Sequence, residues 1–149
     1  MSKRSGEVRA ACAAALALLL AAIATPADAE EVQYYATVDR ERIALDETLT
    51  LQVVLVSDQG ADLAGLELPE APDFEVVHSG RAEQTSFSFG SGGSSFRRQR
   101  TWTMVLRPLR EGELVILPGR VEVGGRRHET GRLTVTVGPA RGGQGQARQ

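Results

Sequence analysis

The sequence has one cysteine and no asparagine. The cysteine, Cys12, lies in an N-terminal apolar run, so the rest of the chain has no thiol for a disulfide, for redox chemistry or for a zinc site. The absence of asparagine excludes N-glycosylation acceptor sites. We therefore expect a fold that is held together by packing and hydrogen bonds alone.

The N-terminus has the three regions of a secretory signal peptide. Lys3 and Arg4 begin a basic segment, residues 10–24 are all apolar, and Ala27-Asp28-Ala29 supplies small residues for cleavage. The apolar run is about 15 residues, shorter than the roughly 20 that span a bilayer. We expect a signal peptide at residues 1–29, cleavage after Ala29, and a periplasmic or cell-envelope location.

The charge of the remaining chain is nearly balanced. Fourteen arginines stand against 17 acidic residues, which gives a formal charge near −3. This small negative charge offers no electrostatic reason to bind a polyanion. Together with the predicted export, it argues against a nucleic-acid partner.

Apolar and polar residues alternate with period two through residues 30–138, and no stretch sustains a helical pattern. Clusters of Gly, Pro and Asp divide this region into about seven to nine short strands. The pattern predicts an all-β domain of the immunoglobulin-like sandwich type, with a closed barrel as the alternative. Residues 139–149 contain no large apolar side chain, which predicts a disordered linker or tail.

The first half of the domain contains one strand with two apolar faces. Residues 48–57 are largely apolar at both alternating sets of positions, which is typical of a central strand. Residues 58–65 are expected to form a loop, and the proline-rich residues 68–72 to run outside the sheet. A short strand is expected at residues 74–78.

A long hairpin is predicted next. Gly80 is expected to make a turn into a strand at residues 81–89, and residues 97–106 to return with Trp102 in the core. Between these strands, residues 90–95 are all Gly or Ser and are expected to form a flexible tip.

No constellation of residues predicts a catalytic site, a cofactor or a metal ion. His78 and His128 are the only histidines and lie on separate predicted elements, whereas zinc needs three or four protein ligands. Asp58 and Asp62 lack the further carboxylates of a calcium loop. The serines of residues 86–95 have no ordered base beside them. We expect a non-enzymatic protein.

Aromatic and basic side chains gather beside the predicted tip, which is typical of a protein–protein contact. The candidate partner-binding residues are Phe87, Phe89, Phe96, Arg97, Arg98 and Arg100. Alternatively, the arginines form ion pairs or cation–π contacts on a sheet face.

Several segments occur in an order and spacing that match a known family. They are Ala36-Thr37-Val38-Asp39-Arg40 with Leu45-Asp46-Glu47-Thr48, Leu68-Pro69 with residues 74–80, residues 101–108 with Gly112, Leu117-Pro118, and Val121-Glu122-Val123-Gly124-Gly125. In these segments the chain resembles the N-terminal module of the BatD family, bacterial oxygen-tolerance (aerotolerance) proteins. Asp46 departs from the pattern, which usually has glycine there, and Leu117-Pro118 stands where a proline pair is common.

The resemblance implies a periplasmic part of a membrane-associated oxygen-tolerance or envelope-stress assembly. Such proteins typically carry further β-sandwich modules and a C-terminal transmembrane helix, and are encoded beside von Willebrand factor A domain membrane proteins and a MoxR-type ATPase. The implied partners are these proteins, with no small-molecule substrate and with the membrane reached only indirectly or through such a helix.

The alternative function is that of a carbohydrate-binding or adhesin-type sandwich. A sugar site needs a platform of exposed aromatic rings. Beyond the signal peptide the chain has only Tyr34, Tyr35, Trp102 and four phenylalanines, most of which the core requires. This scarcity favours a protein-interaction module.

Overall fold

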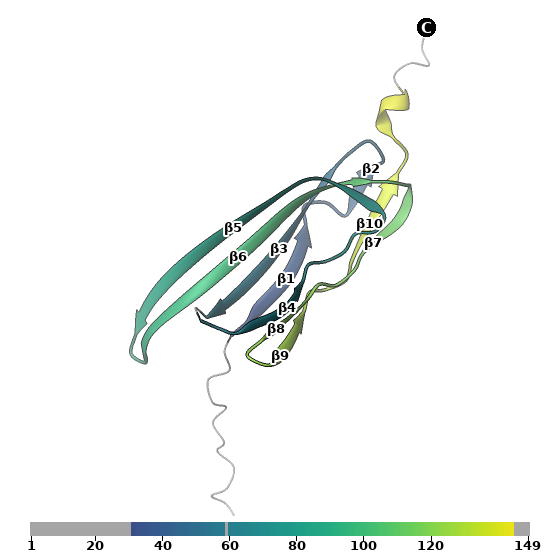
Figure 1. Ribbon diagram of the computed structural model, residues 1–149. Helices are drawn as coiled ribbons and strands as arrows, with labels where there is room; N and C mark the ends of the chain where they lie inside the picture. Colours follow the sequence, from purple (N-terminus) through teal and green to yellow (C-terminus); the bar gives the residue numbers. More distant parts are fainter. Residues whose placement is uncertain (1–30, 59, 145–149) are drawn as a thin grey trace, which may run out of the picture.

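The computed structural model describes residues 31–58 and 60–144. The predicted signal peptide and the last residues of the predicted linker lie outside the described residues. The described part contains ten strands, one more than the expected maximum, and one short 3₁₀ helix (Figure 1). These elements are β1 (Gln33–Val38), β2 (Arg42–Ala44), β3 (Leu49–Asp58), β4 (Leu63–Glu67), β5 (Phe74–Gly90), β6 (Gly93–Pro108), β7 (Gly112–Ile116), β8 (Arg120–Val123), β9 (Arg126–Glu129), β10 (Leu133–Gly138) and η1 (Arg141–Gln144).

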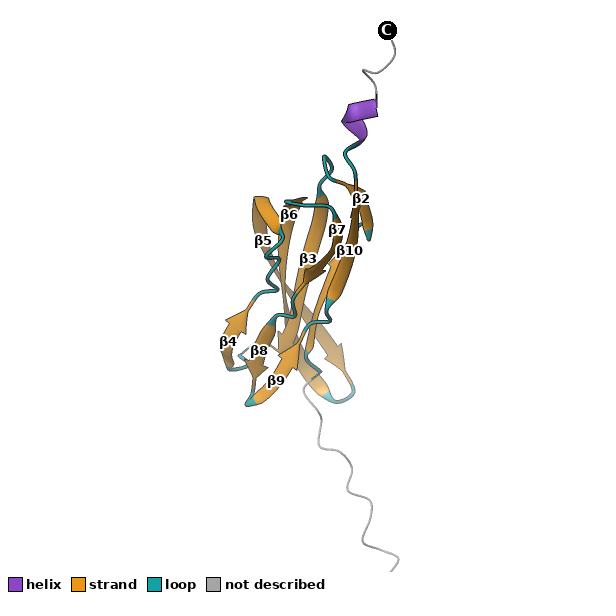
Figure 2. Ribbon diagram, turned by 90° about the vertical axis from the view of Figure 1, so that its right-hand side faces the viewer, coloured by secondary structure: helices purple, strands orange, loops and turns teal. Residues whose placement is uncertain are grey.

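The strands form one large sheet and two small ones. The large sheet has the order β1-β3-β6-β5, and the small sheets have the orders β2-β10-β7 and β4-β8-β9. Figure 2 shows the small sheets toward opposite ends of the molecule, with β2, β10 and β7 near η1 and β4, β8 and β9 at the other end. The fold class is all-β and of the immunoglobulin-like sandwich type, as predicted.

The core lies between the large sheet and the two small ones. Leu49, Leu51, Val53 and Leu55 alternate along β3, and each is at most 1% exposed. The opposite layer contributes the buried residues Ile43, Leu114, Ile116, Val121, Val123, Val135 and Val137. β3 pairs with β1 on one side and β6 on the other, which confirms the predicted central strand. Trp102 is partly buried and packs against this core.

The hairpin is longer and less interrupted than predicted. The predicted turn at Gly80 is wrong, because β5 continues through it and Gly80 lies opposite Thr103 in β6. The irregularity is instead a register shift between Val76 and His78, where an extra residue bends the strand without ending it. Gly80 is therefore a residue without a side chain in the middle of β5, and not a turn residue.

The tip is also shorter than predicted. Pairing continues to Gly90 opposite Gly93, so only Ser91 and Gly92 form the turn. Gly93 has φ of 116°, a conformation that side-chain-bearing residues rarely adopt. The prediction of a loop at residues 58–65 is wrong at its end, since β4 begins at Leu63 and pairs with β8.

A partly buried hydrogen bond links the two layers. The hydroxyl of Tyr34 in β1 donates to the backbone carbonyl of Glu67 in β4 at 2.7 Å. Burial raises the pKa of Tyr34 to about 12, with a smaller contribution from the charge of Glu67. Gly119 packs against this pair, and its amide donates to the buried Thr130 hydroxyl at 2.8 Å. These contacts join β1 to the loop that precedes β8.

Candidate functional site

The β5–β6 hairpin projects beyond the strands beside it. β6 pairs with β3 only as far as Arg97, which lies opposite Asp58, and the residues nearer the tip pair with β5 alone. Figure 1 shows the hairpin extending past the end of β3. We call residues 83–100 of this hairpin the arm. The outer end of the arm, residues 87–96, is the part of the large sheet that continues beyond β3.

One face of the arm continues the core-facing surface of the large sheet. Leu106 in β6 is buried in the core, and every second residue from it toward the tip lies on the same side of the strand. The β5 residues paired with them share that side. This inner face carries Phe96, Arg98 and Arg100 from β6, and Glu83, Thr85, Phe87 and Phe89 from β5.

Three phenylalanines form a cluster at the outer end of the inner face. The rings of Phe87 and Phe89 are perpendicular with centroids 4.0 Å apart, and those of Phe87 and Phe96 are tilted with centroids 4.4 Å apart. Their exposed fractions are 43% for Phe87, 81% for Phe89 and 47% for Phe96. The rings thus contact one another while a large part of their apolar surface remains in water, an arrangement typical of binding surfaces.

The arginines of the inner face surround one carboxylate. Glu83 lies opposite Arg100 in the register, and its Oε2 accepts a hydrogen bond from Arg100 Nε at 3.3 Å. Its Oε1 lies 3.2 Å from Arg98 Nε, and Arg81 Nη2 lies 3.9 Å from Oε2. The expected ion pairs on a sheet face are therefore present, and they fix the two β6 guanidinium groups beside the phenylalanine cluster.

Arg97 is the one candidate residue that the structure separates from the others. It alternates with Phe96 and Arg98 and so lies on the outer face, opposite Asp58. Its Nη2 donates to Glu31 Oε2 at 2.9 Å, and this bond and the positive charge of Arg97 lower the pKa of Glu31. Five of the six predicted residues thus share one face, and the sixth pairs with the start of the described chain.

Sequence reasoning missed Glu83 and Arg81. Both lie on the inner face at positions that alternate with Phe87 and Phe89 along β5. Continuing that period-two pattern through Arg81, Glu83 and Thr85 would have found them.

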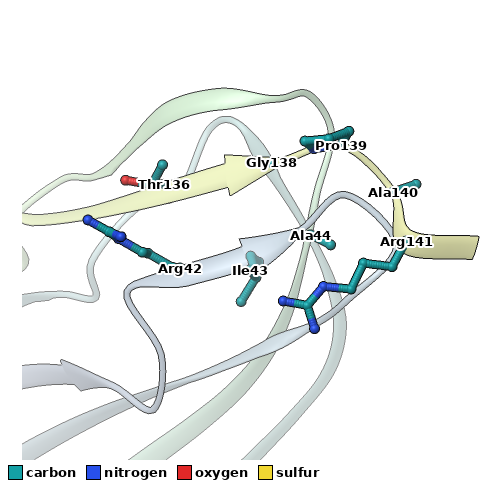
Figure 3. A pocket seen from close by; sticks show the side chains of 8 residues that line it. All are labelled: Arg42, Ile43, Ala44, Thr136, Gly138, Pro139, Ala140 and Arg141. Atoms are coloured by element: carbon teal, nitrogen blue, oxygen red, sulfur yellow. The ribbon is translucent and has the colours of Figure 1, made fainter. Parts of the chain in front are cut away.

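A pocket lies at the opposite end of the sandwich, where the chain leaves β10 (Figure 3). It has a volume of about 380 Å³, and its charged lining residues are Arg42 from β2 and Arg141 from η1. Arg141 Nη1 lies 3.3 Å from Glu47 Oε1. The lining contains no histidine, carboxylate or thiol, so the pocket offers no acid–base pair for catalysis.

Asp46 fixes the chain beside this pocket. Its Oδ1 accepts a hydrogen bond from the backbone N–H of Arg141 at 2.9 Å, and its Oδ2 accepts one from Gly142 at 3.0 Å. These bonds to the charged form lower the pKa of Asp46. This carboxylate thus holds the backbone at the start of η1, in the segment that follows the sandwich.

The remaining polar residues do not converge. His78 lies in β5 and His128 in β9, and within residues 31–58 and 60–144 no three His, Cys, Asp or Glu side chains are placed to hold a metal ion. In the same residues no helix is long and apolar enough to cross a membrane.

A family model described as BatD DUF11 like domain matches residues 36–137, which is more than half of the chain. The match begins in β1 and ends in β10, so it covers all ten strands, and it includes the arm. It confirms the resemblance seen in the sequence segments. Neither a curated protein nor a solved structure matches the chain.

Proposed function

The chain belongs to the BatD family, and on this premise we propose that its β-sandwich is a non-enzymatic protein-interaction module of the bacterial periplasm. It would serve a membrane-associated oxygen-tolerance or envelope-stress assembly. The observation that carries this proposal is the cluster of Phe87, Phe89 and Phe96 at the end of the arm. These rings are exposed and held in mutual contact.

The position of the cluster favours a protein partner. Exposed apolar groups at the end of a projecting hairpin can enter a groove on another molecule, and burying them there would be favourable by roughly 25 cal/mol per Å². Phenylalanine rings are rigid and lose little conformational entropy on binding. The perpendicular packing of Phe87 on Phe89 does not give the flat aromatic platform that a sugar ring needs.

The partners come from the family context. We propose that the arm contacts a von Willebrand factor A domain membrane protein of the kind that BatD-type proteins accompany, in an assembly that also involves a MoxR-type ATPase. The module would then need no cofactor and no direct membrane contact of its own.

Capture from envelope extract tests this function. The mature domain and its Phe87→Ser/Phe89→Ser variant are immobilised and incubated with detergent-solubilised envelope from the source bacterium. The wild type is expected to retain the von Willebrand factor A protein. The amount retained by the variant is expected to be at least about tenfold lower. Leu109→Ser is the matched control, because Leu109 is also exposed but lies in the turn between β6 and β7.

Circular dichroism on the same samples separates folding from binding. A folded double variant that captures the partner as well as the wild type does would exclude the aromatic cluster as the contact site. Equal losses in the double variant and in Leu109→Ser would show that capture depends on general surface hydrophobicity and not on the arm.

A further inference from the structure

The inner face of the arm, together with Arg81 just before it on the same side of β5, carries more positive than negative charge. Arg81, Arg98 and Arg100 share the single carboxylate of Glu83, and no other carboxylate of the described chain lies within 4.0 Å of these three guanidinium groups. The chain beyond residue 29 as a whole is slightly negative. The local excess of about two positive charges is therefore a property of this face.

The two β6 arginines are partly shielded from water. The side chain of Arg98 is 30% exposed and that of Arg100 is 20% exposed. Arg98 Nε is buried, and its 3.2 Å approach to Glu83 is a charge contact without an aligned hydrogen bond. An incoming carboxylate would interact with these groups at a lower effective dielectric than in bulk water, so its attraction would be screened less.

The charged cluster and the aromatic cluster lie along one line. Glu83 and Phe87 are four residues apart on the same face of β5, which corresponds to about 13 Å at roughly 3.3 Å per residue. An extended segment lying along the arm would present side chains to both clusters if an acidic residue and an apolar residue were separated by a similar number of positions. Arginine is suited to this role because its planar guanidinium binds carboxylates with two parallel hydrogen bonds.

We propose that the inner face of the arm recognises an extended acidic segment of a partner protein. In such a segment a carboxylate and an aromatic or aliphatic anchor lie on the same side of the extended chain, two or four residues apart. The anchor packs on Phe87, Phe89 and Phe96, and the carboxylate binds Arg98 and Arg100 in competition with Glu83. This inference rests on the proposed function and adds the chemistry of the partner.

The probe is a phage-displayed library of random 12-residue peptides selected on the purified mature domain. Selected peptides are expected to be enriched in Asp or Glu two or four positions from an apolar residue. A synthetic selected peptide, followed by fluorescence anisotropy, should bind Arg98→Gln/Arg100→Gln about tenfold more weakly and with a smaller salt dependence. Arg107→Gln/Arg120→Gln is the control, since both arginines form surface ion pairs outside the arm.

The variant Glu83→Gln tests the proposal most directly, because the direction of its effect on peptide affinity distinguishes the two roles of Glu83. If Glu83 competes with the ligand, its neutralisation should tighten peptide binding several-fold, whereas a merely structural ion pair would leave affinity unchanged or weaken it. Unchanged or weaker binding to Glu83→Gln would overturn the proposal. The proposal would also be overturned if the selected peptides showed no enrichment in acidic residues or if no peptide could be selected. Binding of a DNA oligonucleotide of the same charge as tightly as the peptide would overturn it as well.

The outcome is separable from that of the proposed function. Suppose that Phe87→Ser/Phe89→Ser loses capture of the membrane protein, while Arg98→Gln/Arg100→Gln and Glu83→Gln do not. This result would support the interaction module and exclude recognition of an acidic segment. Alternatively, acidic peptides could bind as proposed while the phenylalanine changes leave envelope capture unaffected. This result would support the peptide-binding site and exclude the arm as the contact with the membrane protein.

Discussion

Phe87 in β5 lies directly opposite Phe96 in β6, with ring centroids 4.4 Å apart and both rings nearly half exposed. Because these rings and that of Phe89 lie beyond the core, Phe87→Ser/Phe89→Ser should lower the free energy of unfolding by less than about 1 kcal/mol. Phe74→Ala is the contrast, since Phe74 is 6% exposed and its loss should cost about 3–5 kcal/mol. Urea denaturation of both variants measures the difference. Similar losses of unfolding free energy in the two variants would show that the phenylalanine cluster is part of the cooperatively folded core.

The bond from Tyr34 to Glu67 should make stability depend on alkaline pH. The pKa of Tyr34 is raised from 10.0 to about 12 in the folded chain, so its contribution is complete below pH 10 and is lost as the pH rises toward 12. Tyr34→Phe should cost about 0.5–1.5 kcal/mol at neutral pH, because the partly buried hydrogen bond to the carbonyl of Glu67 is lost. Denaturation between pH 8 and 12 should show a flatter alkaline profile for the variant. Parallel profiles would contradict the role of this hydroxyl.

Gly119 leaves no room for a side chain. A Cβ added there would lie 2.6 Å from the carbonyl oxygen of Glu67 and 2.7 Å from the hydroxyl of Tyr34. Gly119→Ala should therefore destabilise the domain by about 1–3 kcal/mol through displacement of this inter-sheet contact. Gly131→Ala is the control, because a Cβ at Gly131 would meet nothing within 4 Å. Equal melting temperatures for the two variants would show that the loop before β8 can shift to accommodate the added methyl group without loss of stability.

Asp46 should protect the chain that follows β10. Its carboxylate accepts the N–H groups of Arg141 and Gly142, so Asp46→Ala should speed tryptic cleavage after Arg141 without changing cleavage elsewhere in the fold. The pKa of Asp46 lies below 3.8, so the contact is present above that pH and is lost as the pH falls through the lowered value. Hydrogen exchange at these two amides measures the same contact. Unchanged cleavage and exchange would show that other contacts hold this segment.

Local alternation predicted the parts of the fold that depend on neighbouring residues. The buried positions of β3 follow from its apolar residues at every second place, and the clustering of Phe87 with Phe89 follows from their spacing in a strand. The ion pairs of Glu83 depend on the register between β5 and β6. That register relates two strands, and the alternation along either strand alone does not specify it.

Contacts between distant segments could not be predicted in this way. Tyr34 and Glu67 are 33 residues apart, and nothing in either local pattern specifies that they meet. Asp46 is separated from Gly142 by 96 residues and was notable only as a departure from a glycine pattern. Such contacts follow from how the two layers are stacked, which one sequence does not specify.

Site-specific photo-crosslinking in the living bacterium tests the central claim most directly. A benzophenone amino acid replaces Phe89, which is 81% exposed at the arm, or Leu109, which is exposed in the β6–β7 turn. Irradiation should join the arm position, and not the Leu109 position, to a membrane protein with a von Willebrand factor A domain, identified by mass spectrometry. A folded and exported protein that forms no crosslink at position 89, or equal crosslinks at both positions, would contradict the account of the arm as the contact surface.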